Sequence, residues 1–212
     1  MKVEIYSDVA CPWCYIGERR FARALEEFRA DEDVEVVYRP YQLDPRAPTP
    51  GVPMLDYLER RFGPGAAGMV DRVVETARAE GLTMDYEHGI AANTLDAHRL
   101  MNLAWVEQGP QAQRQLAERL FEAHFADGAD IADPDVLVDL ATSVGMDADR
   151  VRDYLVTGHG RDEVRQEIER AQRLGISAVP TFVFDGRYAV QGAQSAAVFR
   201  QALETVAAGV SG

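Results

Sequence analysis

The chain has 212 residues, of which 47% are hydrophobic and 27% charged, enough for a buried core and one or two domains. Its 35 acidic against 22 basic side chains give a net charge of −13, which disfavours binding to nucleic acid and to anionic membranes. No apolar run approaches the roughly 20 residues of a membrane-spanning helix, and no signal peptide is visible, so we expect a cytoplasmic protein.

The N-terminal segment predicts a strand, a helix and a second strand. Residues 2–7 begin as an apolar alternation, which is typical of a strand. A helix is expected over residues 12–30, because apolar residues recur on one face, and a strand over residues 34–41. Such a βαβ unit is expected to have parallel strands and a right-handed crossover.

A proline-rich stretch at residues 44–53 follows this unit and marks a boundary. From Met54 to about Gly158 the apolar spacing is nearly all helical, and it predicts four to six helices. Asn93 and Thr94 supply N-cap chemistry for one of these helices.

The pattern changes again in the last segment. A charged helix is expected over residues 161–174. Strands are expected over residues 181–184 and 188–191, because these runs flank an Asp-Gly dipeptide, the strongest short signal for a β-hairpin. A final helix is expected over residues 195–208.

These changes divide the chain into two units. Residues 1–50 and 159–212 together predict an α/β unit, and residues 51–158 predict an all-helical domain inserted into it. A helix, a hairpin and a helix after an initial βαβ unit form the second half of a thioredoxin-like fold. We therefore expect that fold, with a large helical insertion.

The chain contains two cysteines, Cys11 and Cys14, in a Cys-Pro-Trp-Cys motif where the first helix begins. Residues three apart on a helix lie about 5–6 Å apart at Cβ, and modest adjustment brings them within reach of a disulfide. The helix N-terminus would stabilise a Cys11 thiolate. Without a third cysteine a structural disulfide is excluded, and the four scattered histidines do not support a zinc site. The motif indicates redox chemistry.

With these features the chain resembles the DsbA-like branch of the thioredoxin superfamily, and most of all its FrnE-type members. Four pieces carry the resemblance: residues 7–14 with the Cys-Pro-Trp-Cys motif, the helical insertion, Val-Pro-Thr-Phe at residues 179–182, and Gln-Gly-Ala-Gln-Ser at residues 191–195. The similarity spans the whole chain. It implies that the peptide bond between Val179 and Pro180 is cis and lies beside the cysteines.

In the mechanism that the resemblance implies, Cys11 is the exposed nucleophile and Cys14 the buried resolving thiol. Trp13 would contact the substrate at the lip of the site or pack against the insertion, and the Val179 backbone edge would pair with an extended peptide or glutathione. Substrate contacts are thus expected from Pro12, Trp13, Val179 and Pro180. Because the Pro-Trp pair lacks the imidazole of the Pro-His pair in DsbA, we expect a weaker oxidant than DsbA.

Four further residues are candidates for supporting roles. Asp8, three residues before Cys11, would influence proton transfer to the buried thiol or cap a loop. The resemblance places the stretch with Asn93 and His98 at the border of a cleft between subdomains, with a helix cap and a partly buried histidine as the alternative. Ser195 heads the last helix, where backbone N–H groups would hold a carboxylate or Ser195 would act as N-cap.

The leading hypothesis is a cytoplasmic thiol–disulfide oxidoreductase that acts as a reductase or isomerase, because the dithiol should dominate in a reducing compartment. No bound cofactor or metal is expected: the redox centre is the Cys11–Cys14 disulfide, with glutathione as a candidate co-substrate. The expected partners are a thiol- or disulfide-containing protein or small molecule and a redox partner, for a monomer or homodimer. No role is assigned to His88, His124 or His159.

Two alternatives use the same scaffold. One is a glutathione-dependent isomerase or transferase of the 2-hydroxychromene-2-carboxylate isomerase or kappa type, although those relatives typically have Ser-Pro-x-Ser at the position of Cys-Pro-Trp-Cys. The other is a non-catalytic redox sensor or a chaperone that holds its clients in the helical cleft. The FrnE resemblance also suggests the tailoring of an aromatic polyketide, by family association.

Overall fold

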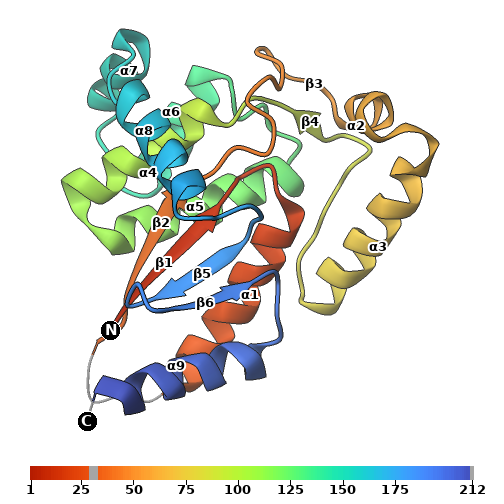
Figure 1. The fold of residues 1–212 in the computed structure, drawn as a ribbon. Coiled ribbons are helices and arrows are strands. Elements are labelled where there is room, and N and C mark those ends of the chain that lie inside the picture. The colour runs from red at the N-terminus through yellow and green to blue at the C-terminus, as the bar shows by residue number, and fades with distance from the viewer. Residues whose placement is uncertain (29–32, 211–212) are drawn as a thin grey trace.

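A four-stranded sheet lies at the centre of the fold in the computed structural model, which describes residues 1–28 and 33–210 (Figure 1). The sheet has the order β2-β1-β5-β6. Its strands are β1 (Lys2–Ser7), β2 (Glu35–Pro40), β5 (Thr181–Phe184) and β6 (Tyr188–Gln191). β1 pairs in parallel with β2 and antiparallel with β5, and β5 pairs antiparallel with β6. The predicted parallel strands and hairpin are confirmed.

Helices occupy most of the remaining described chain. They are α1 (Pro12–Glu27), α2 (Met54–Phe62), α3 (Ala66–Ala79), α4 (Leu95–Gln108), α5 (Pro110–Phe125), α6 (Pro134–Ser143), α7 (Ala148–Thr157), α8 (Arg161–Arg173) and α9 (Ala196–Val210), with a 3₁₀ turn η1 (Gly63–Gly65). The segment between β2 and α8 is mainly helical, as predicted. Residues 29 and 30, the expected end of the first helix, lie outside the described residues. The division into domains after residue 50 and before residue 159 stays a prediction.

Aromatic rings fill the face of the sheet that α1 and α9 cover. The ring centroid of Phe21 in α1 lies 5.3 Å from that of Phe182 in β5 and 5.6 Å from that of Phe199 in α9. Phe182 and Phe199 lie 4.4 Å apart. All three side chains are buried, and aromatic pairs at such distances add to the stability that burial provides. This packing fixes α1, and with it the cysteine motif at its N-terminus.

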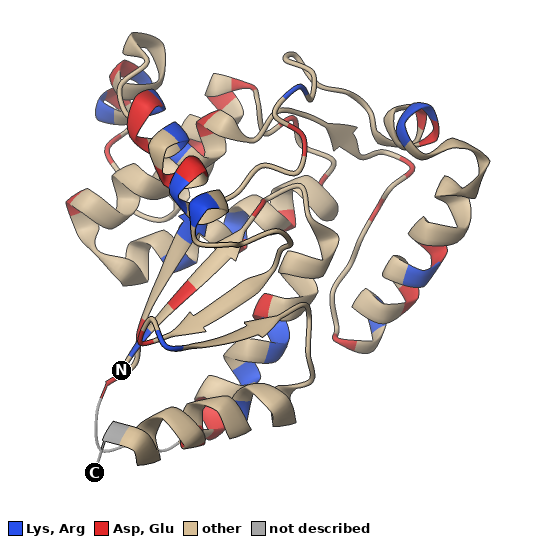
Figure 2. Ribbon diagram, in the orientation of Figure 1, with Lys and Arg blue, Asp and Glu red and all other residues tan. Residues whose placement is uncertain are grey.

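The opposite face of the sheet is partly polar. Arg39 of β2 lies 2.7 Å from the carboxylate of Glu4 in β1 and 3.7 Å from that of Glu167 in α8. Its guanidinium lies 5.2 Å from the ring centroid of Trp105 in α4. In Figure 2 the ribbon of α8 carries both acidic and basic residues along its length. Arg39 therefore links this second face to α8 through an ion pair and to α4 through a cation–π contact.

Helices α2 and α3 lie apart from the main helical group, on the side of α1 (Figure 1). Arg20 and Arg23 of α1 each bind Glu80, the residue after α3, at 2.7 Å. Two short strands, β3 (Val52–Pro53) and β4 (Ile90–Ala91), pair antiparallel beside α2. They were not predicted, because a two-residue pairing between distant segments leaves no periodicity. Within the described residues, no helix has the length and apolar character needed to cross a membrane.

Candidate active site

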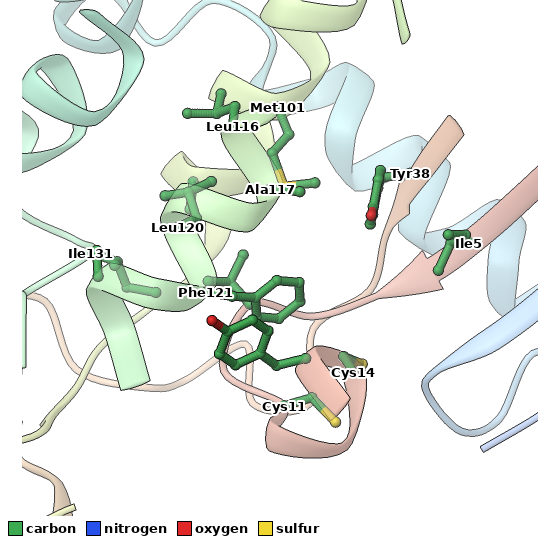
Figure 3. Packing of buried hydrophobic residues seen from close by; sticks show 14 of the residues in the cluster. Ile5, Cys11, Cys14, Tyr38, Met101, Leu116, Ala117, Leu120, Phe121 and Ile131 are labelled. Atoms are coloured by element: carbon green, nitrogen blue, oxygen red, sulfur yellow. The ribbon is translucent and has the colours of Figure 1, made fainter. Parts of the chain in front are cut away.

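The two cysteines lie on the first turn of α1 (Figure 3). Cys11 is the N-cap residue with an extended backbone, and Pro12 occupies the first helical position, where a missing N–H breaks no helical hydrogen bond. The Cys11 carbonyl accepts a hydrogen bond from the backbone N–H of Cys14 at 3.0 Å. Both cysteines are free thiols. The predicted placement of the motif at the helix start is confirmed.

The Cys11 side chain is only 3% exposed, so the expectation of an exposed thiol is wrong. The physical reason is that apolar side chains from distant segments surround the start of α1. Together with Cys11 they line a cavity of about 200 Å³. Prominent among them are Met54, Leu58, Phe62, Met69, Val73 and Phe125. Trp13 also lines this cavity and is 40% exposed, which places its ring at the lip. Cys11 therefore borders this cavity and has almost no surface open to solvent.

Cys14 is 2% exposed and was correctly predicted to be buried. Burial raises the pKa of its thiol well above the ordinary value, and the hydrogen bond to Cys11 and the charge of Cys11 raise it further. Hydrogen bonds from the Asp8 backbone and the Ser7 hydroxyl lower the pKa. Cys14 therefore stays protonated at neutral pH. Ser7, the last residue of β1, was not singled out as a partner of Cys14 in the sequence.

The loop before β5 brings Val179 and Pro180 to the cysteines. Their peptide bond is cis, and the Cys11 thiol donates to the Val179 carbonyl with an S···O distance of 3.8 Å. Pro180 packs against α1 at Gly17, where an added Cβ would lie 3.0 Å from Cγ of the proline. Glycine at this position permits the close approach of the loop to the helix. Cys11 and Val179, 168 positions apart in the sequence, therefore lie side by side.

Asp8 lies in the loop between β1 and α1, and its side chain is buried. One carboxylate oxygen accepts the Leu43 N–H at 2.7 Å, and the other lies 3.3 Å from Nε2 of His98 in α4. The backbone carbonyl of Asp8 accepts the Cys11 N–H at 3.0 Å. The carboxylate thus ties the cysteine loop to two other segments. The structure brings two of the predicted supporting residues, Asp8 and His98, into contact.

Asn93 and Ser195 do not line the cavity beside Cys11. The Asn93 side chain accepts the Leu95 N–H at 2.9 Å and donates to two carbonyls of the proline-rich stretch at 3.1 and 3.3 Å. It holds that stretch against the start of α4, whereas Thr94 makes no side-chain cap, contrary to the prediction. Ser195 is exposed at the start of α9, where its hydroxyl accepts the Val198 N–H at 3.4 Å.

A second cavity, of about 310 Å³, adjoins the first. The two cavities share the lining residues Ala10, Leu43, Met54, Leu58 and Phe62. Asp8 and His124 of α5 also line the second cavity. No role was predicted for His124, whose only sequence signal is a position on the apolar face of α5, three residues after Phe121. In residues 1–28 and 33–210, no group of three or more His, Cys, Asp or Glu side chains is arranged to hold a metal ion.

Comparisons with known proteins agree with this geometry. The model of the DSBA-like thioredoxin domain matches residues 2–204. The crystal structure of a probable DsbA oxidoreductase from Streptomyces coelicolor is 39% identical, covers 97% of this chain and 89% of that chain, and has a TM-score of 0.88. YwbO of Bacillus subtilis (strain 168) is 28% identical over 206 residues, which are 95% of this chain and 94% of YwbO. The cytosolic disulfide reductase DsbM from Pseudomonas aeruginosa, solved with GSH, is 19% identical with a TM-score of 0.69, and the match covers 97% of this chain and 98% of DsbM.

Proposed function

Because this chain belongs to the DSBA-like thioredoxin domain family, we propose that it is a thiol–disulfide oxidoreductase with Cys11 as nucleophile and Cys14 as resolving thiol. The observation that carries the proposal is the placement of both thiols on the first turn of α1, beside the Val179 carbonyl. The raised pKa of Cys14 supports the division of roles, because the resolving thiol should stay protonated until the mixed disulfide forms.

In the reducing direction, the Cys11 thiolate attacks one sulfur of a substrate disulfide. The substrate S–S bond breaks, and the leaving sulfur departs as a thiolate that takes up a proton. Cys14 then loses its proton and attacks the Cys11 sulfur, which releases the second substrate thiol. Two electrons pass to the substrate, and a Cys11–Cys14 disulfide remains. A low-molecular-weight thiol such as glutathione is the proposed reductant that restores the dithiol.

Substrate contacts are proposed for the residues around the thiol pair: Pro12, Trp13, Val179 and Pro180. Trp13 at the lip of the cavity and the contact between Val179 and the Cys11 thiol support these assignments. Asp8 is a positioning residue, because its carboxylate and carbonyl hold the cysteine loop through Leu43, His98 and Cys11 itself.

The proposed setting is the cytoplasm, and the proposed direction is reduction or isomerisation. The Pro-Trp spacer lacks the imidazole charge of DsbA's Pro-His pair, which favours a less oxidising disulfide. The fold is shared with a protein described as a cytosolic disulfide reductase. A FrnE-type role is proposed on the motifs that carry the resemblance, residues 7–14 and 191–195.

Insulin reduction by dithiothreitol tests the proposed function. The wild type should accelerate the reaction, and the Cys14→Ser variant should accumulate mixed disulfides through Cys11, which mass spectrometry detects. Cys11→Ser is the matched control, and it should form no such adduct. Wild-type protein that leaves insulin reduction unchanged, together with a Cys14→Ser variant that traps nothing, would contradict the proposal.

The size of the two cavities favours a second candidate, a glutathione-dependent isomerase or transferase. Cavities of about 200 and 310 Å³ suit a small molecule, and both adjoin the cysteine loop. This candidate predicts that glutathione binds to a variant with both cysteines changed to serine and that insulin reduction is not accelerated. Insulin reduction that requires both cysteines would instead support the oxidoreductase.

A further inference from the structure

His124 is a buried polar residue that the proposed thiol chemistry does not use. Its side chain is 1% exposed, and neither ring nitrogen has a hydrogen-bond partner among the described residues. The ring of Phe125 lies against it with a centroid distance of 4.6 Å. Buried polar atoms are nearly always hydrogen-bonded in folded proteins, so two unpartnered nitrogens on one ring need an explanation.

The imidazole is neutral under ordinary conditions. Burial lowers the pKa of His124 to about 4, although the charges of Asp8 and Asp130 act in the opposite direction. A neutral imidazole has one nitrogen that donates a hydrogen bond and one that accepts. It therefore suits a hydroxyl or carbonyl oxygen better than a charged group.

The charged side chains that share the cavity with His124 already have partners. Asp44 accepts hydrogen bonds from the Tyr57 hydroxyl at 2.6 Å and from the Arg61 guanidinium. Asp8 is bound to a backbone N–H and to His98. An anionic ligand would meet the carboxylates of Asp8 and Asp44, because the guanidinium of Arg61 on the wall is already paired with Asp44. A cationic ligand would find both carboxylates already bound to other groups. The polar group of the lining that lacks a partner among the described residues is the neutral imidazole of His124, which an uncharged polar atom would satisfy.

Apolar side chains form the rest of this wall, among them Leu43, Met54, Leu58 and Phe62. We infer that this cavity binds an uncharged, mainly apolar small molecule through a hydroxyl or carbonyl oxygen that hydrogen-bonds to His124. Such a ligand supplies the partner that the ring lacks and fills a volume of about 310 Å³. The inference goes beyond thiol–disulfide exchange, because binding at His124 requires neither cysteine.

Calorimetric titration with 1-naphthol and naphthalene tests the inference, because the two probes share an apolar body and differ in one hydroxyl. The wild type should bind 1-naphthol more tightly than naphthalene. His124→Phe should weaken 1-naphthol binding about tenfold and leave naphthalene binding unchanged. His88→Phe, at an exposed histidine, is the matched control and should bind both probes like the wild type.

Cys11→Ser should also bind 1-naphthol like the wild type, so a failure of the thiol chemistry leaves this inference standing. Should His124→Phe not fold, nitrogen NMR of the wild type replaces it, and the imidazole resonances of His124 should shift with 1-naphthol but not with naphthalene. Absence of 1-naphthol binding, equal affinity for the two probes, or unmoved His124 resonances would each overturn the inference.

Discussion

Two fully buried basic side chains in the helical part of the chain have opposite surroundings. Arg99 of α4 donates to the carbonyls of Tyr154, Leu155 and His159 at 2.6 to 3.3 Å and to the carboxylate of Asp96 at 2.8 Å. His124 of α5 has no such partner. A buried group with a complete set of partners belongs to the architecture, whereas one without partners at a cavity wall is a place for a ligand.

Breaking the Arg99 cluster should have the largest effect. Arg99→Met removes a charged donor from three carbonyls and from the Asp96 carboxylate, and the free energy of unfolding should fall by about 3–5 kcal/mol. Urea unfolding measures the loss. Arg150→Met is the control, because the exposed pair of Arg150 with Glu107 should contribute no more than about 1 kcal/mol. A loss below 1 kcal/mol for Arg99→Met would contradict the structural role.

The imidazole of His124, buried and without a partner among the described residues, predicts a loss of stability in acid. The pKa of His124 falls from 6.5 to about 4 on folding. Between these pH values His124 is protonated in the unfolded chain and neutral in the folded chain. Stability is fully present above pH 6.5 and declines as the pH falls towards 4, by about 3 kcal/mol, since one pH unit corresponds to about 1.4 kcal/mol per proton. Urea unfolding between pH 4 and 7.5 should show a flatter profile for His124→Phe than for the wild type. Parallel profiles would exclude a buried neutral imidazole.

Glu18 is intermediate between Arg99 and His124 in its number of partners, because its buried carboxyl accepts a hydrogen bond from the Tyr38 hydroxyl at 2.5 Å. Burial raises its pKa from 4.5 to about 7, although that hydrogen bond lowers it. The folded chain therefore holds a proton that the unfolded chain has lost, and stability declines as the pH rises from 4.5 through 7, again by about 3 kcal/mol. Glu18→Gln should remove this decline, and Glu26→Gln, on the exposed face of α1, should retain it. If the Glu18→Gln variant still loses stability between pH 4.5 and 7, a group other than Glu18 causes the loss.

The smallest effect concerns Cys14, a buried thiol with partial hydrogen bonding. Ser7→Ala removes a hydroxyl that lowers the Cys14 pKa, so resolution of the mixed disulfide should slow by about threefold to tenfold. Stopped-flow kinetics should show that attack by Cys11 keeps its rate, and Ser7→Thr should restore resolution because it retains the hydroxyl. Equal slowing of both steps would indicate a general disturbance of the loop.

Elements with local signals were predictable from the sequence. The bounds of β1, β5 and β6 agree with the predicted ranges 2–7, 181–184 and 188–191. Alternation marks such strands, and the hairpin turn needs positive φ at two residues, which Asp185 and Gly186 have at 47° and 66°. The cysteine motif was likewise placed correctly at the start of α1.

The cavity could not be predicted in the same way, because distant segments form it. Met69 of α3 and Phe125 of α5 line the cavity beside Cys11, and nothing in the sequence near residue 11 indicates their approach. The isolation of His124 is likewise a property of all the segments around it. The cap of α4 was assigned to Asn93 and Thr94 together, and only the geometry of the loop shows that Asn93 provides it.

The most direct measurement of the proposed chemistry is a redox titration of Cys11 and Cys14 against glutathione, followed by mass spectrometry of the alkylated protein. A single two-electron transition should appear, at a potential more reducing than the value of about −120 mV for DsbA. The absence of a two-electron transition would contradict the proposed redox pair. A potential as oxidising as that of DsbA would contradict the proposed direction of electron flow.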